Sequence, residues 1–241
     1  MTAAEESQIR WARLAGFLYL FTYVVPITGM TIIGRYKVVG NFAETAHRVA
    51  GSELFYRFGL SCLLLNCLLC IFLAMGLYVS LKPVNSTLAL FGLLFRLTEN
   101  ILATAFVILD FAVVKAYAGG DMSAVFTEKQ LSALTALLSQ AGAAQFNVSM
   151  VFLGIGSAFF FYVFLKSAYI PKVLSVFSLC ASPIFIGASF ALLFWPQYSA
   201  RLQVGWYPMA LAEVSIGLWL LIKGLNLQPR MPAGSQTRLS A

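Results

Sequence analysis

The most regular feature of the sequence is a series of long apolar stretches separated by short polar connections. A helix needs roughly 20 predominantly apolar residues to cross the hydrocarbon core of a bilayer. The pattern therefore predicts an all-α polytopic membrane protein, a bundle of six transmembrane helices with short interfacial helices. The predicted spans cover residues 12–33, 55–81, 85–114, 145–165, 173–194 and 206–222.

These spans divide the chain into three parts. We expect residues 1–11 to be a cytoplasmic N-terminal segment and residues 12–225 to be a single six-helix transmembrane domain. Residues 226–241 contain prolines and many polar residues, which predicts a disordered cytoplasmic tail. The first apolar stretch is too long for the core of a signal peptide, so we expect it to remain as a span.

Two of the connections carry patterns of short interfacial helices. In residues 35–53, an apolar face follows helical spacing and predicts a helix lying on the membrane surface. After the third span, Thr127 and Gln130 have the spacing of a capping box, and an apolar stripe follows them. The apolar face comprises Phe42, Ala46, Val49 and Leu54, and the stripe comprises Leu131, Leu134 and Leu138.

Spans two, four and six share an ending, an aromatic residue four positions before a lysine. An aromatic belt followed by positive charge is typical of the cytoplasmic end of a span. We therefore expect these three ends on one side, with both termini cytoplasmic in the plasma (inner) membrane, although Arg35 and Lys37 lie in an outer loop. The three pairs are Tyr78 and Lys82, Tyr162 and Lys166, and Trp219 and Lys223.

The composition excludes several classes of protein. Hydrophobic residues make up 60% of the chain and charged residues only 10%, which a soluble domain does not show. The formal charge of +7 is spread over helix ends instead of a basic face, so we expect the lipid bilayer as partner and no nucleic acid. The four cysteines lie within apolar stretches, which favours reduced thiols.

A polar centre interrupts the third span. Arg96, Glu99 and Asp110 share one helical face, and charges in a span avoid lipid because each costs roughly 2.5 to 3.5 kcal/mol at its centre. At about 1.5 Å per residue, Arg96 and Glu99 lie at nearly the same depth as Glu213 of the sixth span. We predict that spans three and six are adjacent and that Arg96, Glu99, Asn100 and Glu213 form a ligand-binding or proton site.

The charges of this centre do not balance, because one arginine faces two glutamates. A second buried carboxylate has no cation of its own, so one of the two glutamates is expected to hold a proton. The alternative interpretation is an ion-paired clamp that only holds the bundle together.

Further polar residues lie outside this centre. Arg57 and Asp110 have similar depth near the outer surface, which predicts an outer-end polar pair. Asn66 and Asn147, like Asn100, are expected to link helices by hydrogen bonds, each worth about 0.6 to 2 kcal/mol in a membrane.

Motifs of the common enzyme classes are missing from the sequence. It contains no GxSxG, HExxH, Walker A or dinucleotide-binding glycine pattern, and its single histidine, His47, has no second histidine or cysteine nearby. Cys67 and Cys70 have CxxC spacing but lie in mid-span among leucines, where a reactive thiolate is disfavoured. We therefore expect no catalytic motif, no metal and no cofactor.

Four segments together resemble a known family. In the order SELFYRFG, LKPVNSTLALFGLLFRLTEN, FLKSAYIPKVLSVFSLC and LAEVSIGLWLLIKGLN, they are similar to blocks of the bacterial domain-of-unknown-function 4386 family, over residues 12–226. The resemblance implies a small multi-helix bacterial membrane protein and brings no established activity. Its blocks fall on Arg57, Lys82, Arg96, Glu99, Pro171, Glu213, Trp219 and Lys223.

Three functions are compatible with these patterns. The first is binding or transport of a small or lipid-like ligand at the intramembrane Arg/Glu centre. The second is a structural or regulatory membrane subunit without a ligand, and the third is an intramembrane enzyme that uses Glu99 or Glu213 as acid or base. A cavity that reaches the charges would favour a carrier or an enzyme, whereas a sealed and fully paired centre would favour the structural role.

Overall fold

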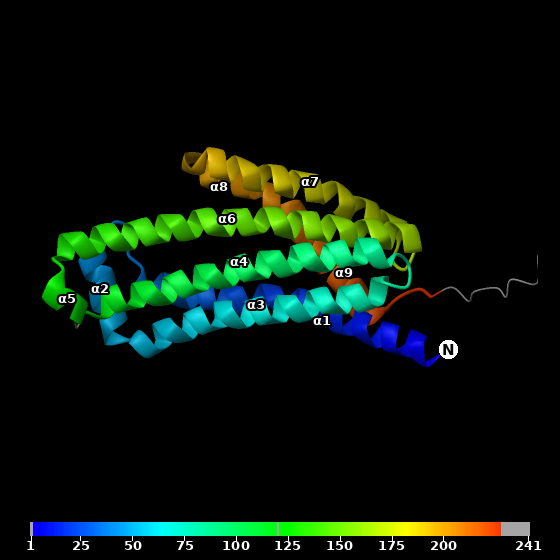
Figure 1. The fold of residues 1–241 in the computed structure, drawn as a ribbon, viewed down its shortest axis with the longest axis horizontal. Helices are drawn as coiled ribbons and strands as arrows, with labels where there is room; N and C mark the ends of the chain where they lie inside the picture. The colour runs from blue at the N-terminus through cyan, green and yellow to red at the C-terminus, as the bar shows by residue number, and fades with distance from the viewer. Residues whose placement is uncertain (1, 120, 228–241) are drawn as a thin grey trace, which may run out of the picture.

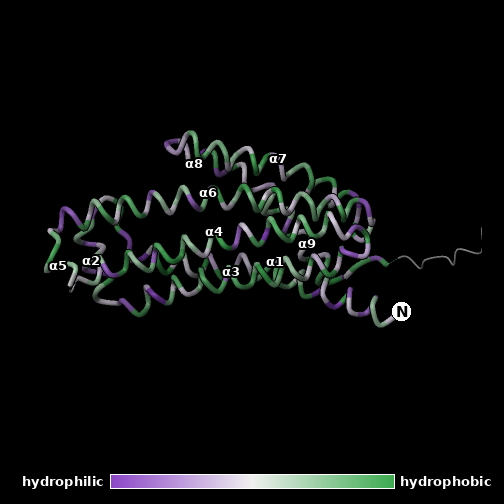
Figure 2. Tube along the Cα trace, in the orientation of Figure 1, coloured by the Kyte–Doolittle hydropathy of each residue, from purple (hydrophilic) through white to green (hydrophobic). Residues whose placement is uncertain are grey.

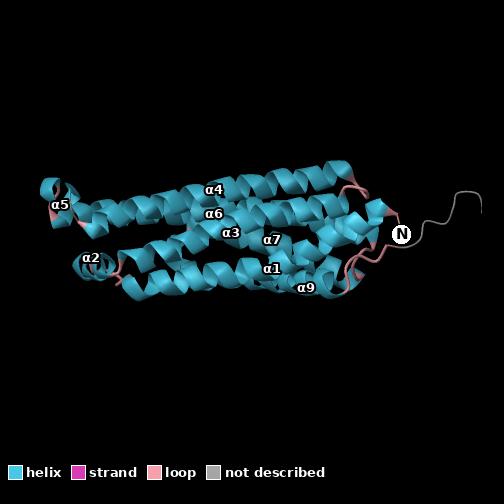
Figure 3. Ribbon diagram, turned by 90° about the horizontal axis from the view of Figure 1, so that it is seen from below, coloured by secondary structure: helices cyan, strands magenta, loops and turns pink. Residues whose placement is uncertain are grey.

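The fold is an all-α bundle whose helices run side by side along its long axis (Figure 1), as the view turned by 90° also shows (Figure 3). The structure is a computed structural model, and residues 2–119 and 121–227 are described here. For Asp121 only the backbone is described. Within these ranges there is no β-strand. Six helical segments are long and apolar enough to cross a membrane, so the predicted polytopic bundle is confirmed. They are α1 (Ala3–Tyr36), α3 (Glu53–Leu81), α4 (Ser86–Ala118), α6 (Glu128–Ser167), α7 (Lys172–Phe194) and the segment that ends with α9 (Tyr207–Ile222).

The six spans form a closed ring in chain order. Each span packs on the next one along the chain, and α9 packs back on α1. In this order α4 and α9 lie opposite each other, and the main neighbours of α9 are α1 and α7. The expectation that spans three and six are adjacent was therefore wrong. Counting residues along two spans shows that two side chains lie at the same depth in the membrane, but it does not show which helices are neighbours.

Hydropathy along the chain agrees with a membrane-spanning bundle. Figure 2 shows hydrophilic segments gathered toward the two ends and hydrophobic segments between them. Large apolar side chains such as Phe17, Phe72 and Ile101 are exposed on the outer surface of the bundle. A surface of this kind is suited to lipid contact.

Helices form in both predicted connections, but Leu54 lies outside the first one, and the second is not a separate interfacial helix. The first interfacial helix is α2 (Phe42–Gly51), in which Val49 is buried, whereas Leu54 of the predicted apolar face belongs to α3 and is exposed. The capping box at Thr127 is present. The helix that it begins, α6, runs on without a break into the fourth span, because the residues between them are mostly good helix formers.

The remaining connections are short. The turn after Leu81 is closed by Asn85, whose side chain accepts a hydrogen bond from the backbone nitrogen of Leu88 and caps α4. A single helical turn, α5 (Asp121–Val125), precedes α6. Between α7 and α9 the chain forms η1 (Pro196–Tyr198), α8 (Ser199–Leu202) and η2 (Gln203–Trp206).

The start of α1 and the end of α9 lie at the end of the bundle that carries the α3–α4 turn (Figure 1). Lys82 lies 5.9 Å from the ring centre of Tyr78, and Lys166 lies 5.3 Å from that of Tyr162. The shared spacing of spans two and four thus forms cation–π contacts. Of the predicted tail, Asn226 donates a backbone hydrogen bond to the carbonyl oxygen of Tyr169, and residues 228–241 lie outside the described residues.

Two glycines allow α1 and α9 to approach closely. A methyl group at Gly16 would lie 2.5 Å from the backbone nitrogen of Leu221 and 2.7 Å from the backbone oxygen of Gly217. A methyl group at Gly217 would in turn lie 2.8 Å from the Cβ of Tyr19. Small residues at such crossings let two backbones pack directly in a membrane. This contact closes the ring at the end that carries the termini.

We expect Gly16→Ala to destabilise the protein by about 1 to 3 kcal/mol, because the added methyl group forces two backbones apart. The matched control is Gly187→Ala on α7, where the added methyl group would meet no atom within 4 Å. Thermal unfolding in detergent should show a clear loss for the first variant and none for the second. Equal stability of the two variants would contradict the close α1–α9 packing.

Candidate functional site

The three predicted charges meet at the centre of the ring. The Arg96 Nε lies 3.7 Å from Oε2 of Glu99, and its Nη1 lies 3.9 Å from Oε1 of Glu213. All three side chains are buried, with Arg96 only 3% exposed. Because α4 and α9 lie opposite each other, the long arginine side chain reaches across the interior of the ring. The predicted meeting of Arg96 with Glu99 and Glu213 is therefore observed, although the helices that carry Arg96 and Glu213 are not neighbours.

A glycine on α6 makes room for the arginine. A methyl group at Gly156 would lie 2.9 Å from the Cγ of Arg96 and 3.1 Å from its backbone nitrogen. One turn earlier on α4, a methyl group at Gly92 would lie 2.8 Å from the ring of Phe160. These close approaches hold α4 against α6 and keep the stem of Arg96 packed. No spacing rule in the sequence pointed to Gly156.

Neutral donors hold the two carboxylates. Tyr23 on α1 donates to Oε2 of Glu213 at 2.9 Å, and Ser157 on α6 lies 3.4 Å from Oε1 of the same residue. Asn100 donates from Nδ2 to Oε2 of Glu99 at 3.0 Å and to the carbonyl oxygen of Arg96 at 2.7 Å. Sequence analysis missed Tyr23 and Ser157, because they come from other helices and share no spacing with the charged residues.

The hydrogen bonds of this centre remain incomplete. Both distances between Arg96 and a glutamate exceed the range of 2.7 to 3.2 Å that is typical of N–H···O hydrogen bonds. Among the described residues, the buried atoms Arg96 Nη1, Asn66 Oδ1 and Asn100 Oδ1 have no hydrogen-bond partner. Buried polar atoms in native proteins are nearly always satisfied, by protein or by ordered water, so these three atoms are open to water or to a polar group of a ligand.

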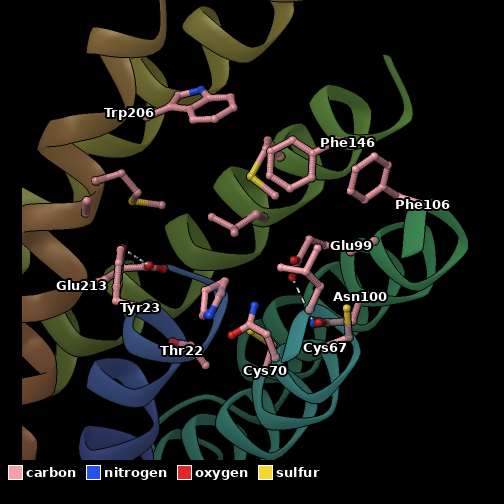
Figure 4. A pocket seen from close by; sticks show the side chains of 18 of the residues that line it. Thr22, Tyr23, Cys67, Cys70, Glu99, Asn100, Phe106, Phe146, Trp206 and Glu213 are labelled. Carbon is pink, nitrogen blue, oxygen red and sulfur yellow. Dashed lines mark hydrogen bonds between the residues drawn. The ribbon is translucent and has the colours of Figure 1, made fainter. Parts of the chain in front are cut away.

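The three unsatisfied atoms belong to residues that line one cavity of about 360 Å³. Every span contributes to its wall. In Figure 4, Glu213 and Tyr23 lie toward one side, Glu99 and Asn100 toward the other, and Trp206 above them. Aromatic residues form much of the remaining wall: Tyr23, Phe106, Phe146, Phe185, Trp206 and Tyr207. The cavity thus combines a charged region with an apolar, aromatic one.

The cavity has a rim on the outer surface of the bundle. Ile27 and Met30 on α1 and Tyr207 on α9 line the cavity and are also 60%, 53% and 69% exposed, respectively. Measured from the Tyr23–Glu213 hydrogen bond, Met30 and Tyr207 lie about 10 Å away along their helices, toward the end that carries α2. The cavity therefore opens sideways between α1 and the start of α9.

The predicted outer-end pair is replaced by two other ion pairs. Arg57 Nε lies 2.6 Å from Oε1 of Glu53, and Asp110 Oδ1 lies 3.9 Å from Nζ of Lys37. Glu53 lies one turn before Arg57 on the same helix, so it reaches the guanidinium without crossing the bundle. Asp110 instead faces the residue that follows α1. The Arg57–Asp110 pair was therefore wrong, and neither residue lines the central cavity.

Two cysteines also border the site. Cys67 and Cys70 are buried free thiols on α3, and both line the cavity. Their spacing places them on the inner face of the ring, one turn apart. In this setting they are small apolar wall residues.

Together, these features define a class, a polytopic α-helical membrane protein with a charged cavity inside the bundle. The model of a family described as "Domain of unknown function (DUF4386)" matches residues 14–224, and the chain belongs to this family. No curated protein and no solved structure matches the chain.

We expect Glu213→Gln to be tolerated better than Arg96→Leu. Glutamine keeps the shape and acceptor of a neutral acid, whereas leucine leaves two buried carboxyl groups without a cation, a change that costs about 3 to 5 kcal/mol in buried ion pairs. Protonation neutralises carboxylates, so the loss in Arg96→Leu should shrink from about pH 8 to about pH 5. Thermal stability in detergent across this range is the measurement.

Equal losses in the two variants would show that the cation is not needed to hold the two carboxyl groups. A loss in Arg96→Leu that is independent of pH would show that the cost comes from packing instead of charge.

Proposed function

We propose that this integral membrane protein binds a small or lipid-like amphiphile in the central cavity and thereby carries or senses it within the membrane. The polar part of the ligand contacts Arg96, Glu99, Asn100 and Glu213, and its apolar part contacts the aromatic wall. The observation that supports this proposal most directly is that the cavity reaches charges whose hydrogen bonds are incomplete.

A purely structural clamp is less well supported. Such a clamp is stabilising only when its charges are closely paired and their remaining hydrogen bonds are satisfied. Here the arginine lies 3.7 and 3.9 Å from its two carboxylates, and one of its nitrogens has no hydrogen-bond partner. A centre with this geometry is less stable than a sealed one, which favours a role that needs open binding groups.

The size and shape of the cavity suit a small amphiphile. Its volume of about 360 Å³ lies at the lower end of the range of roughly 300 to 1,000 Å³ for small-molecule sites. The rim at Ile27, Met30 and Tyr207 faces the region of the lipid tails, so an apolar chain can enter from the bilayer without passing through water. We therefore propose lateral entry between α1 and α9.

We propose further that the protein resides in the bacterial plasma membrane with both termini in the cytoplasm. The aromatic residue four positions before a lysine at the ends of α3 and α6 supports this orientation, because an aromatic belt followed by positive charge is typical of a cytoplasmic end.

The orientation predicts which loops react from outside the cell. Val39 lies in the α1–α2 connection and is fully exposed, and Pro83 lies exposed in the α3–α4 turn. In intact cells, a membrane-impermeant maleimide should label Val39→Cys, whereas Pro83→Cys should react only after permeabilisation. The parent chain, with its four native cysteines within the spans, is the control. The reverse pattern would contradict the orientation.

Filling the cavity should abolish binding. Ala103 on α4 lines the cavity, so Ala103→Phe should occupy the space that the ligand needs. Ile101→Phe is the matched control, because Ile101 lies on the same helix and is 69% exposed. Native mass spectrometry from lipid nanodiscs should show a bound small molecule in the parent and in the control but not in Ala103→Phe.

The same bound mass in all three proteins, or none in the parent, would contradict the proposal. A bound molecule that is chemically altered during incubation would instead favour an intramembrane enzyme.

A further inference from the structure

We infer that the polar head of the ligand is an ammonium group, so that the ligand is a cationic amphiphile. This inference rests on the proposed function and specifies the chemistry that the site recognises. It follows from the charges of the centre, from the hydrogen-bonding atoms left open and from the aromatic wall.

The charges of the site favour a cation. Among the described residues, Arg96 is the only basic side chain that lines the cavity, and Glu99 and Glu213 are the acidic ones. With both carboxyl groups ionised, the site carries one unmatched negative charge. An anionic head near Arg96 would meet two carboxylates within 4 Å of the guanidinium, whereas a monocation would neutralise the site.

The open hydrogen-bonding atoms also favour a donor. The Nδ2 of Asn100 is already engaged by Glu99 and by the backbone of Arg96, so its unsatisfied Oδ1 is left to accept. Asn66 Oδ1 is a second buried acceptor on the same cavity. The hydroxyl of Tyr23 is used by Glu213. An ammonium group supplies three N–H donors and no acceptor, which matches these atoms.

Arg96 Nη1 is the one unsatisfied donor among the described atoms of the cavity, and it does not outweigh the two unsatisfied acceptors. It lies 3.9 Å from Oε1 of Glu213, so its charge is already directed at a carboxylate. A movement of about 1 Å by either side chain would close that hydrogen bond. The acceptors of Asn66 and Asn100 have no comparable partner among the described residues.

The aromatic wall suits the same ligand. The ring centre of Trp206 lies 6.0 Å from that of Phe146, edge to face, and 5.7 Å from that of Phe185. The ring of Phe146 in turn lies 5.8 Å from that of Phe106. A continuous aromatic cluster attracts a cation through its ring faces and receives an apolar chain. Both parts of a cationic amphiphile are thus matched by one cavity.

A proton competes with such a ligand for the unmatched charge. Five titratable groups from four helices lie around Arg96: Tyr19 and Tyr23 on α1, Cys70 on α3, Glu99 on its own helix and, across the ring, Glu213 on α9. The carboxylates are the groups that a proton neutralises in the acidic range. Binding of the ammonium ligand should therefore weaken as the pH falls, because the site is already neutral when one carboxyl group is protonated.

Three probes that share an eight-carbon alkyl chain and differ in their head group test this inference. They are octylamine, octanol and octanoate. Binding is measured to the full chain in lipid nanodiscs, with empty nanodiscs as the correction for partition into lipid. At about pH 8, octylamine should bind roughly tenfold or more tightly than octanol, and octanoate should bind weakest. At about pH 5, the preference for octylamine should shrink, while binding of octanol should stay unchanged.

Two variants separate recognition of the ammonium head group from binding of the alkyl chain of the probe. Glu213→Gln should lose the preference for octylamine but still bind octanol, because it removes the unmatched charge and leaves the apolar wall intact. Glu53→Gln is the matched control, since it makes the same chemical change at an exposed ion pair outside the cavity and should keep the preference.

The outcomes distinguish the two proposals. Tighter binding of octanoate, equal binding of all three probes, or a preference that survives in Glu213→Gln would overturn the ammonium head and leave the ligand cavity standing. Binding no stronger than to empty nanodiscs for all three probes would overturn the proposed function itself.

Discussion

A guanidinium group buried in the middle of a membrane protein must find its partners inside the protein, because neither water nor lipid supplies them. Arg96 meets part of this requirement by reaching across a closed ring of six helices toward glutamates on its own helix and on the opposite one, while its Nη1 has no hydrogen-bond partner among the described residues. The ring order, the close contact at Gly156 and the hydrogen bond from Tyr23 to Glu213 all serve this arrangement. The bundle is organised around one charge that no single neighbouring helix could satisfy.

The same arrangement leaves space where a compact bundle would be filled. The seam between α1 and α9 is tight at Gly16 and Gly217, is bridged by Tyr23 and Glu213, and opens beyond that bridge. The wide part of the ring therefore lies on the far side of the charged centre from the chain termini. An occupant there would contact charge at one end and aromatic rings at the other, which is why an amphiphile is the best-supported ligand.

The sequence was sufficient for the parts of the fold that depend on local pattern. The spans follow from long apolar stretches, and the meeting of Arg96, Glu99 and Glu213 follows from the cost of charge in lipid together with depth along two helices. Helix neighbours could not be predicted this way, because depth carries no information about position around a ring. For this reason α4 and α9 were expected to be adjacent, although they lie opposite each other.

The missed contacts have similar physical reasons. Tyr23 and Ser157 reach Glu213 from other helices, and Gly156 matters only because α6 packs closely on Arg96. At the outer end, Arg57 pairs with Glu53, one turn away on its own helix, and not with Asp110. Depth along the helices alone does not show which of two carboxylates an arginine will pair with.

The most direct test of the central claim is an electron cryomicroscopy map of the full chain in lipid nanodiscs with no ligand added. We expect elongated density in the cavity, with one end beside Asn100 and Glu99 and the other against Trp206. A collapsed cavity, in which Arg96 forms hydrogen bonds with both glutamates and no density remains, would contradict the account.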